Sequence, residues 1–267
     1  MLADNELTPI PLIPRRGVLV HRDGSIESKR QLLQSEFAFT AVLNGKETRT
    51  FVCSPCNIKE LVVGWLKTQG FIDSFDDIRS VEVDSSISTV EVDFSPSTQI
   101  GAIRAVSPIE WSPRAIFGMC DDFFLDSPAH RATYGIHSCY LYGPDGKLAC
   151  RYEDLGRHNA FDKVIGDGLI NGIDLLRSTI FSSGRMPTDM VLKAIRAGVP
   201  ILVTKAVPTN ETIELAQRYN LTLICSAHKD SMVVYNDPLG IVMLDNGLNG
   251  YVINKTLMIE RTGRSDY

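Results

Sequence analysis

The chain has 267 residues, of which 44% are hydrophobic and 22% are charged, and its formal net charge is −5. This is the composition of an ordinary globular protein long enough for one large or two modest domains, and its negative balance gives no broad attraction to nucleic acid or an anionic membrane. No apolar run reaches the roughly 20 residues of a membrane helix and the start lacks a signal-peptide pattern, so we expect a cytoplasmic protein.

The first part of the chain is predicted to be an arm followed by a small β-rich domain. Residues 1–16 contain three prolines and are expected to be extended. Alternating apolar residues predict strands in residues 17–107, for example at Phe37–Leu43 before a tight turn at Asn44-Gly45. One helix is expected to interrupt these strands, from about Asn57 until Gly70 ends it.

The second part is predicted to be larger and of another kind. Residues 108–132 carry several prolines and no sustained periodicity, so we expect a mobile loop with room for one short helix, and this loop contains Cys120. In residues 133–267, strand-like and helical segments alternate with short links, and two edge strands are expected at 232–235 and 241–243. The predicted fold class is therefore α/β with a partly parallel sheet, preceded by a smaller β-rich α+β domain.

The most unusual stretch runs from Glu153 to Gly166 and reads EDLGRHNAFDKVIG. Its apolar residues recur at helical spacing, while seven polar side chains crowd the start of the helix and its other face. In one interpretation Asp154 or Asn159 caps a surface helix. Asp162 would then pair with His158 one turn away. In the other interpretation the free N–H groups at the helix start bind an anion.

This stretch closely resembles the signature of the FdhD family, the formate dehydrogenase accessory sulfurtransferases. The resemblance extends to Cys53–Pro55, Glu60–Gly64, Ser183–Arg185, Ala197–Val203 and Pro208–Thr209. It implies a cytidine-deaminase-like, three-layer α/β fold for residues 133–267. The family typically has a C-G-x-C loop where this chain reads Phe117-Gly118-Met119-Cys120, so only the second cysteine is present.

The resemblance implies a sulfur carrier. A cysteine desulfurase would load Cys120 with a persulfide, and the sulfur would pass to the molybdenum of a bis-molybdopterin guanine dinucleotide cofactor before it enters formate dehydrogenase. A free guanine nucleotide would be a partial mimic of that cargo, and by analogy we expect a homodimer. Phe117 motivates an alternative, a cofactor-binding chaperone without transfer chemistry. A third hypothesis is a thiol hydrolase in which Cys120 acts with His137 or His158.

The expected site residues form two groups. Arg185 follows a glycine at a strand end, where α/β sheets commonly bind ligands, and Lys205 and Thr209 hold equivalent positions. With these, the implied cofactor-binding residues are Arg157, His158, Asn159, Arg185, Lys205, Thr209, Ser226, Ala227, His228, Lys229, Asp230 and Ser231. The pocket beside the Cys120 loop is expected to contain Thr133, Gly135, His137 and Asp162. His137 could instead be a core histidine, and residues 226–231 a polar turn.

No metal site is predicted. Cys53 and Cys56 form a C-x-x-C pair, but no second pair follows at zinc-site spacing, so both are expected to be structural. The H-x-E and P-C-x-x-C halves of the zinc-deaminase signature are absent, as are Walker and Rossmann glycine motifs. Cys139, Cys150 and Cys225 lie in strand-like runs and are expected to be buried thiols.

Overall fold

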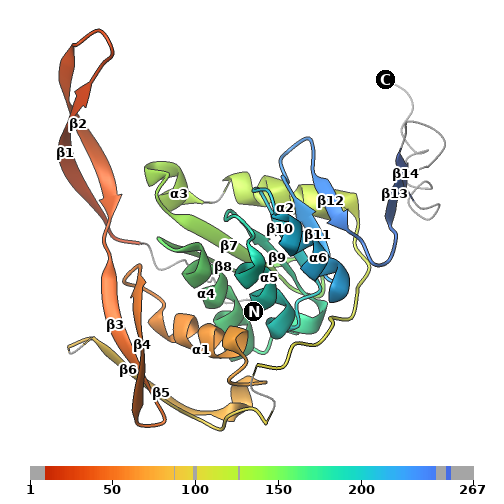
Figure 1. Ribbon diagram of the computed structural model, residues 1–267. Helices are drawn as coiled ribbons and strands as arrows, with labels where there is room; N and C mark the ends of the chain where they lie inside the picture. The colour runs from red at the N-terminus through yellow and green to blue at the C-terminus, as the bar shows by residue number, and fades with distance from the viewer. Residues whose placement is uncertain (1–9, 87, 99–100, 126, 245–250, 254–267) are drawn as a thin grey trace.

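A computed structural model describes residues 10–86, 88–98, 101–125, 127–244 and 251–253 (Figure 1). The strands are β1 Leu12–Val20, β2 Ile26–Gln34, β3 Phe37–Leu43, β4 Lys46–Cys53, β5 Ile78–Asp84, β6 Thr89–Phe94, β7 His137–Tyr142, β8 Leu148–Asp154, β9 Thr179–Ser182, β10 Ile201–Thr204, β11 Thr222–Cys225, β12 Val233–Asn236, β13 Val242–Leu244 and β14 Tyr251–Ile253. The α-helices are α1 Ile58–Gln69, α2 Pro113–Leu125, α3 Pro128–Thr133, α4 Arg157–Ile170, α5 Thr188–Ala197 and α6 Asn210–Arg218.

A six-stranded sheet forms the larger half of the molecule, in the order β12-β11-β10-β9-β7-β8. Strands β9, β10 and β11 are parallel, β7 runs antiparallel to both β8 and β9, and β12 runs antiparallel to β11. Strands β8 to β11 therefore all run in one direction. Their last residues, Asp154, Ser182, Thr204 and Cys225, mark one side of the sheet, which we call the carboxyl edge.

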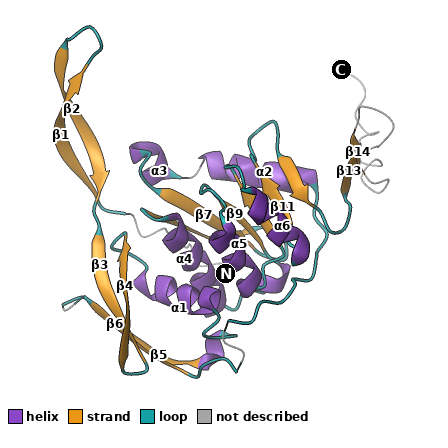
Figure 2. Cartoon of the chain, in the orientation of Figure 1, coloured by secondary structure: helices purple, strands orange, loops and turns teal. Residues whose placement is uncertain are grey.

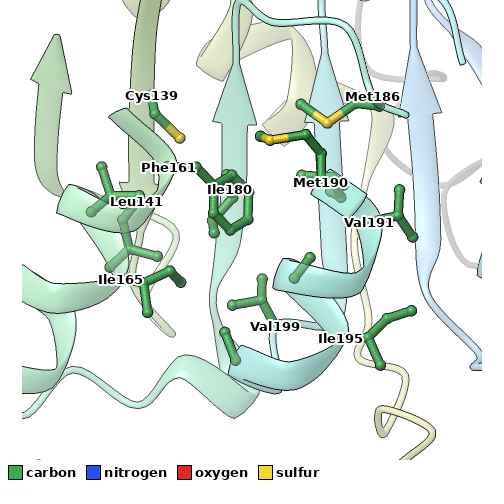
Figure 3. Close-up of a cluster of buried hydrophobic side chains, with 14 of the residues drawn as sticks. Cys139, Leu141, Phe161, Ile165, Ile180, Met186, Met190, Val191, Ile195 and Val199 are labelled. Atoms are coloured by element: carbon green, nitrogen blue, oxygen red, sulfur yellow. The ribbon is translucent and has the colours of Figure 1, made fainter. Parts of the chain in front are cut away.

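Each face of this sheet is covered by helices, because side chains alternate between faces along each strand. Leu141 and Ile180 pack with α4, α5 and α6 in the main core (Figure 3). Their neighbours Tyr140 and Phe181 pack against α2 on the opposite face. Helix, sheet and helix thus form three layers (Figure 2), and the predicted α/β class is confirmed.

The smaller half is a four-stranded sheet, ordered β4-β3-β6-β5, with α1 against one face. The expected turn between β3 and β4 is present, with positive φ at Asn44 and Gly45. Helix α1 crosses α4 so closely that a Cβ on Gly64 would overlap the carbonyl oxygen of Asp162, and a Cβ on Gly166 would overlap that of Glu60. Only glycine permits this approach.

The N-terminal part of the chain differs from the prediction. Strand β1 begins at Leu12 and pairs with β2 in a hairpin that projects from the body (Figure 1), so the expected boundary at residue 16 falls inside a strand. Residues 1–9 of the expected arm lie outside the described residues. At the other end, β12 joins the main sheet as expected, but β13 pairs with β14 in a separate two-stranded sheet.

The prediction of a loop at residues 108–132 is wrong for most of its length, because α2 and α3 occupy it. The hydroxyl of Ser112 accepts a hydrogen bond from Ala115 N at 3.1 Å and so caps α2, with Pro113 at the first helical position. Ile116, Met119, Cys120 and Phe123 then recur on the buried face at i, i+3, i+4 and i+7. The sequence carries this pattern in spite of the prolines at 108, 113 and 128.

The segments expected after residue 133 agree closely with the structure. The helix predicted to stop at Gly198 is α5, where Gly198 has φ 84°, and the helix capped by Thr209 is α6. The strands expected before and after α6 are β10 and β11. None of the helices in the described part of the chain is long and apolar enough to cross a membrane.

Candidate functional site

Helix α4 begins at the carboxyl edge, directly after β8. Its N-cap is Gly156, which has no side chain to accept a hydrogen bond from the first turn, so the expectation that Asp154 or Asn159 caps this helix is wrong. The Gly156 N–H instead donates to the Asp154 carboxylate at 2.9 Å. The side chain of Arg157 lies against Gly184, where a Cβ would come within 2.8 Å of the Arg157 Cβ. Its Nε is buried and has no hydrogen-bond partner among the described residues. The structure thus brings an unsatisfied cationic donor to this edge.

His137 also reaches the carboxyl edge, since β7 begins there. Its Nδ1 lies 3.1 Å from the Ser183 hydroxyl, which also accepts a hydrogen bond from Ser138 N at 3.0 Å. Burial lowers the pKa of His137, and the nearby guanidinium of Arg157 lowers it further. His137 is therefore a half-buried imidazole at the edge whose neutral form is favoured, and both of its expected roles are compatible with this position.

The other expected cofactor-binding residues at strand ends also lie along this edge. Arg185 is exposed just beyond β9, and Lys205 follows β10. Thr209 is the N-cap of α6, with its hydroxyl accepting from Thr212 N at 3.3 Å. The helices α4, α5 and α6 each follow a strand that ends here, so their N-termini open on the same side of the sheet.

Residues 226–231 form a turn that closes one end of the edge. The N–H of Ala227 donates to Thr204 O at 3.0 Å, which ties the turn to the neighbouring strand, and His228 N donates to Ser231 O at 2.8 Å. Ala227 is buried, whereas His228 to Ser231 are exposed. The segment thus follows β11 at the carboxyl edge and presents an exposed polar surface.

Three residues expected in the site have other contacts. Asp162 is buried and forms an ion pair with Lys193, while its second carboxylate oxygen accepts from the Thr68 hydroxyl at 2.7 Å. The interpretation that paired Asp162 with His158 is therefore wrong. His158 Nε2 instead lies 3.4 Å from the Asp189 carboxylate at the start of α5. Burial and the Lys193 ammonium lower the pKa of His158.

Asn159 belongs to a buried cluster around Asp154. Lys163 Nζ lies 2.6 Å from the Asp154 carboxylate, and both side chains are completely buried. The same carboxylate accepts from the Asn159 amide at 2.9 Å and from Ser54 N at 3.1 Å. The Asn159 amide also donates to Val52 O at 2.8 Å. Sequence reasoning missed this cluster, although the i, i+4 spacing of Asn159 and Lys163 on one helix indicated a shared partner.

We call this set of contacts around α4 the clamp; Ser54 and Thr68 come from the smaller half, and Asp154, Asn159, Asp162, Lys163 and Lys193 from the larger half. Beside it, an open groove of about 360 Å³ is lined by His158 together with Arg49 and Trp65 of the smaller half. His158 faces this groove and Arg157 faces the carboxyl edge, so the two neighbours in the motif serve different surfaces.

Thr133 and Gly135 lie at the base of the projecting hairpin. The Thr133 hydroxyl donates to Ala129 O at 2.8 Å and accepts from Gly135 N at 3.2 Å. Gly135 O accepts from the Gln34 amide at 3.0 Å, and a Cβ at residue 135 would come within 2.8 Å of that amide nitrogen. Both residues therefore join the hairpin to the body in this structure.

Cys120 is not in an exposed loop. It lies in α2 with 0% of its surface exposed, among the side chains that cover the second face of the sheet. Burial raises the pKa of its thiol from an ordinary 9.0 to about 11; the Asp121 carboxylate contributes, while the Lys205 ammonium acts in the opposite direction. Lys205 Nζ also lies 5.5 Å from the centre of the Phe123 ring on the same helix. The thiol is therefore inaccessible but adjacent to the carboxyl edge.

The other cysteines are buried, as Cys120 is. All six cysteines are free and buried, and burial raises the pKa of Cys53 to about 12. No hydrogen bond joins Cys120 to His137 or His158 in the described part of the chain, which gives the hydrolase hypothesis no support. Within the same residues, no group of three or more His, Cys, Asp and Glu side chains is arranged to hold a metal ion.

Comparison with known proteins agrees with this architecture. The model of the FdhD/NarQ family matches residues 34–102 and 90–242. The sulfur carrier protein FdhD of Bacillus subtilis (strain 168) is 33% identical over 250 residues, covering 84% of this chain and 95% of the relative. The protein of the same name from Methanothermobacter thermautotrophicus is 33% identical over 221 residues, covering 75% and 87%.

A solved structure shows the same relationship in three dimensions. The crystal structure assigned as a formate dehydrogenase accessory protein from Desulfotalea psychrophila superposes with a TM-score of 0.77 at 26% identity. The match covers 86% of this chain and 99% of that one. Taken with the family match over most of the sequence, this shows that the chain belongs to the FdhD/NarQ family.

Proposed function

We propose that this protein is a sulfur carrier needed for formate dehydrogenase activity, with a cofactor cradle at the carboxyl edge and Cys120 as the sulfur-bearing residue. Its relatives bear the name sulfur carrier protein FdhD. The observation that carries the proposal is the position of Lys205, which follows β10 at the carboxyl edge while its ammonium lies 5.5 Å from the centre of the Phe123 ring on α2, the helix that contains Cys120. Lys205 thus links the proposed cradle to the helix that carries Cys120.

The cargo of the cradle would be the molybdenum cofactor with its two guanine dinucleotide ends, which is a substrate here. The pyrophosphate groups of such a molecule are anions, and Arg157, Arg185 and Lys205 bring positive charge to the edge beside the N-termini of α4 and α6. The Arg157 Nε, which has no hydrogen-bond partner among the described residues, would supply a further donor to such an anion. The exposed turn 228–231 would then border the guanine end.

Sulfur transfer requires the Cys120 thiol to become accessible, because a fully buried thiol cannot meet a partner protein. A shift of α2 away from the sheet would expose it and bring it out of the environment that raises its pKa. The Cys120 thiolate would then attack the outer sulfur of a persulfide on the cysteine desulfurase. The new S–S bond would leave a persulfide on Cys120 and return the desulfurase cysteine as a thiolate.

Mass spectrometry tests this step directly. After incubation with a cysteine desulfurase and cysteine, the intact protein should gain about 32 Da, the mass of one sulfur atom. The adduct should be absent from Cys120→Ala and retained in Cys225→Ala, a matched control because Cys225 is also completely buried but packs on the other face of the sheet. An adduct that survives in Cys120→Ala, or no adduct on the wild-type protein, would contradict sulfur carriage by Cys120.

A second candidate function is a cofactor-binding chaperone without sulfur transfer, and the burial of Cys120 together with Phe117 favours it. Both functions require the cradle, so both predict that GDP binds. They differ in cells that lack the wild-type protein: Cys120→Ala should fail to restore formate dehydrogenase activity if the protein carries sulfur. The chaperone function predicts that the same variant restores it.

A further inference from the structure

The open groove beside the clamp carries two basic side chains without counter-charges. Helices α1, α4 and α5 lie side by side around it (Figure 1), and its volume of about 360 Å³ falls within the range of small-molecule pockets. Lys193 in its wall is neutralised by Asp162. Arg49 and Arg196 also line the groove, and neither forms an ion pair with a carboxylate in the part of the chain that the structure describes. Their charge is therefore available to an anion.

Arg49 is held in place by two aromatic rings. Its guanidinium lies 5.5 Å from the centre of the Phe51 ring and 5.4 Å from that of the Trp65 ring. These cation–π contacts hold the charge near the rings without supplying a hydrogen-bond acceptor of the usual strength. Among the described residues, no oxygen accepts a hydrogen bond from this guanidinium. Arg49 is therefore positioned before any ligand arrives, which reduces the conformational freedom that binding would cost.

Arg196 reaches the same groove from α5. Its Nη1 donates to Thr68 O at 3.4 Å, which is long for a hydrogen bond, and its Nε has no partner among the described residues. Most of its hydrogen-bonding capacity is therefore unused. Thr68 follows Trp65 by three residues on α1, so Arg49 and Arg196 contact this helix at points about 4.5 Å apart along its axis. The two arginines thus meet at one small region of α1.

We propose that this groove binds a small organic phosphate, with the phosphate group held between Arg49 and Arg196. The two oxygens of a carboxylate are occupied by a single guanidinium fork, whereas a phosphate group has enough oxygens to accept from two forks. Because the forks come from two separate elements, β4 and α5, the site fits phosphate better than carboxylate. The rest of the ligand would lie against Leu192 and Gln69, which line the same groove. A ligand in this position would connect the smaller half to the larger half.

This site is separate from the proposed cradle. Helix α5 begins at the carboxyl edge, and Arg196 lies in its last turn, seven residues after Asp189. At about 1.5 Å per residue, Arg196 lies roughly 10 Å along the helix from that edge. The Asp189 carboxylate, which contacts His158 at 3.4 Å, is at the opposite end of the groove and does not neutralise Arg196. The proposal therefore depends neither on the cradle nor on sulfur transfer.

Fluorine NMR can follow binding at this site, because the chain has two tryptophans and one of them, Trp65, lines the groove. Trp111 packs on the other face of the main sheet, where its indole N–H donates to Asp237 at 3.2 Å, and so serves as an internal reference. With both replaced by fluorotryptophan, inorganic phosphate should shift the Trp65 signal in a saturable manner and leave the Trp111 signal unchanged. The variant Trp111→Phe assigns the two signals.

Substitution of the arginines tests the assignment of the site. Arg49→Gln/Arg196→Gln should raise the dissociation constant for phosphate at least about tenfold, because charge-assisted hydrogen bonds are lost. Arg49→Gln alone changes an exposed side chain and should raise it at least about fourfold. The control Arg114→Gln/Arg218→Gln removes the same charge from exposed positions on α2 and α6, and should keep the constant within about twofold. An unchanged Trp111 signal shows that each variant remains folded.

Two further ligands complete the test. Acetate should bind at least about tenfold more weakly than phosphate, because one carboxylate cannot serve both forks. GDP, titrated by calorimetry, should bind the wild-type protein and Arg49→Gln/Arg196→Gln with affinities within about twofold, because the cradle lies elsewhere. The proposal would be overturned by a Trp65 signal that phosphate does not move, by equal phosphate binding in the double variant, by acetate binding as tight as that of phosphate, or by a large loss of GDP affinity in the double variant.

Discussion

One side of α4 forms a buried structural contact, whereas the other faces the carboxyl edge, where we propose the cofactor cradle; one stretch of sequence forms both. The clamp side carries Asp154, Asp162 and Lys163, which are fully or almost fully buried and satisfied by ion pairs and hydrogen bonds. The edge side carries Arg157, whose Nε has no hydrogen-bond partner among the described residues. Charged residues in a single motif can therefore have different roles, one in buried structural contacts and one at the surface of the carboxyl edge. Their burial and their hydrogen-bond partners distinguish the two.

The clamp is the side on which substitutions should affect stability most. Buried charges are costly when they lose a partner, and a helix crossing that admits no Cβ leaves no space for relaxation. Substitutions of residues at the carboxyl edge, by contrast, should leave the free energy of unfolding nearly unchanged and weaken ligand binding.

Gly64→Ala should have the largest effect. The new methyl group would overlap the backbone of α4 at Asp162, so the two helices would have to separate and the clamp would open. We expect a loss of at least about 4 kcal/mol in the free energy of unfolding, measured by urea denaturation. The control is Gly118→Ala on the exposed side of α2, where a Cβ meets no atom within 4 Å; it should raise stability by roughly 0.5–1 kcal/mol through helix propensity. Equal effects of the two substitutions would contradict the close helix crossing.

Lys163→Met should be the next most damaging change. It keeps the length of the side chain but leaves the completely buried Asp154 carboxylate without its ammonium partner. The expected cost is about 3 kcal/mol or more in the same urea experiment. Replacing both members, as in Lys163→Met/Asp154→Leu, should recover part of the loss. A single variant as stable as the wild-type protein would show that the ion pair is not important for the clamp.

The local elements of the fold could be predicted from the sequence, whereas contacts between distant elements could not. The amphipathic helices and strands after residue 133 were predictable because their periodicity and their stops, such as Gly198, act locally. The clamp was not, since Lys193 reaches Asp162 from another helix and no local pattern specifies that pairing. The prolines near Cys120 favour a loop, but the Ser112 cap and the apolar face of α2 outweigh them and form a helix.

The thiol of Cys120 should react slowly in the folded protein. Since burial raises its pKa from 9.0 to about 11, the thiolate fraction at pH 7.5 falls by about 100-fold relative to an ordinary cysteine. Iodoacetamide labelling followed by peptide mass spectrometry should therefore modify Cys120 at least that much more slowly in buffer than in urea. Rapid labelling in buffer would show instead that α2 opens readily. Because the folded pKa is raised, this thiol should also favour the folded state below pH 9 and lose that contribution as the pH rises towards 11.

The smallest expected effect is the loss of folding stability at acidic pH. The pKa values of His137 and His158 are lowered in the folded protein, so the unfolded chain binds more protons and stability should decline as the pH falls below about 6.5. His137→Gln removes one of these titrating groups at the edge. The variant should lose less stability than the wild-type protein between pH 7 and pH 5 in thermal unfolding experiments. A steeper loss in the variant would contradict the direction of the shift.

The most direct test of the division of α4 measures binding and stability on the same edge variant. In Arg157→Gln the guanidinium beside Gly184 is lost, while the clamp is untouched. Isothermal titration calorimetry should show GDP binding weakened at least about tenfold, the cost expected for a lost charge-assisted hydrogen bond to phosphate, and the unfolding midpoint in urea should stay unchanged. Unchanged GDP affinity combined with a large loss of stability would place Arg157 in the clamp and contradict the proposed cradle.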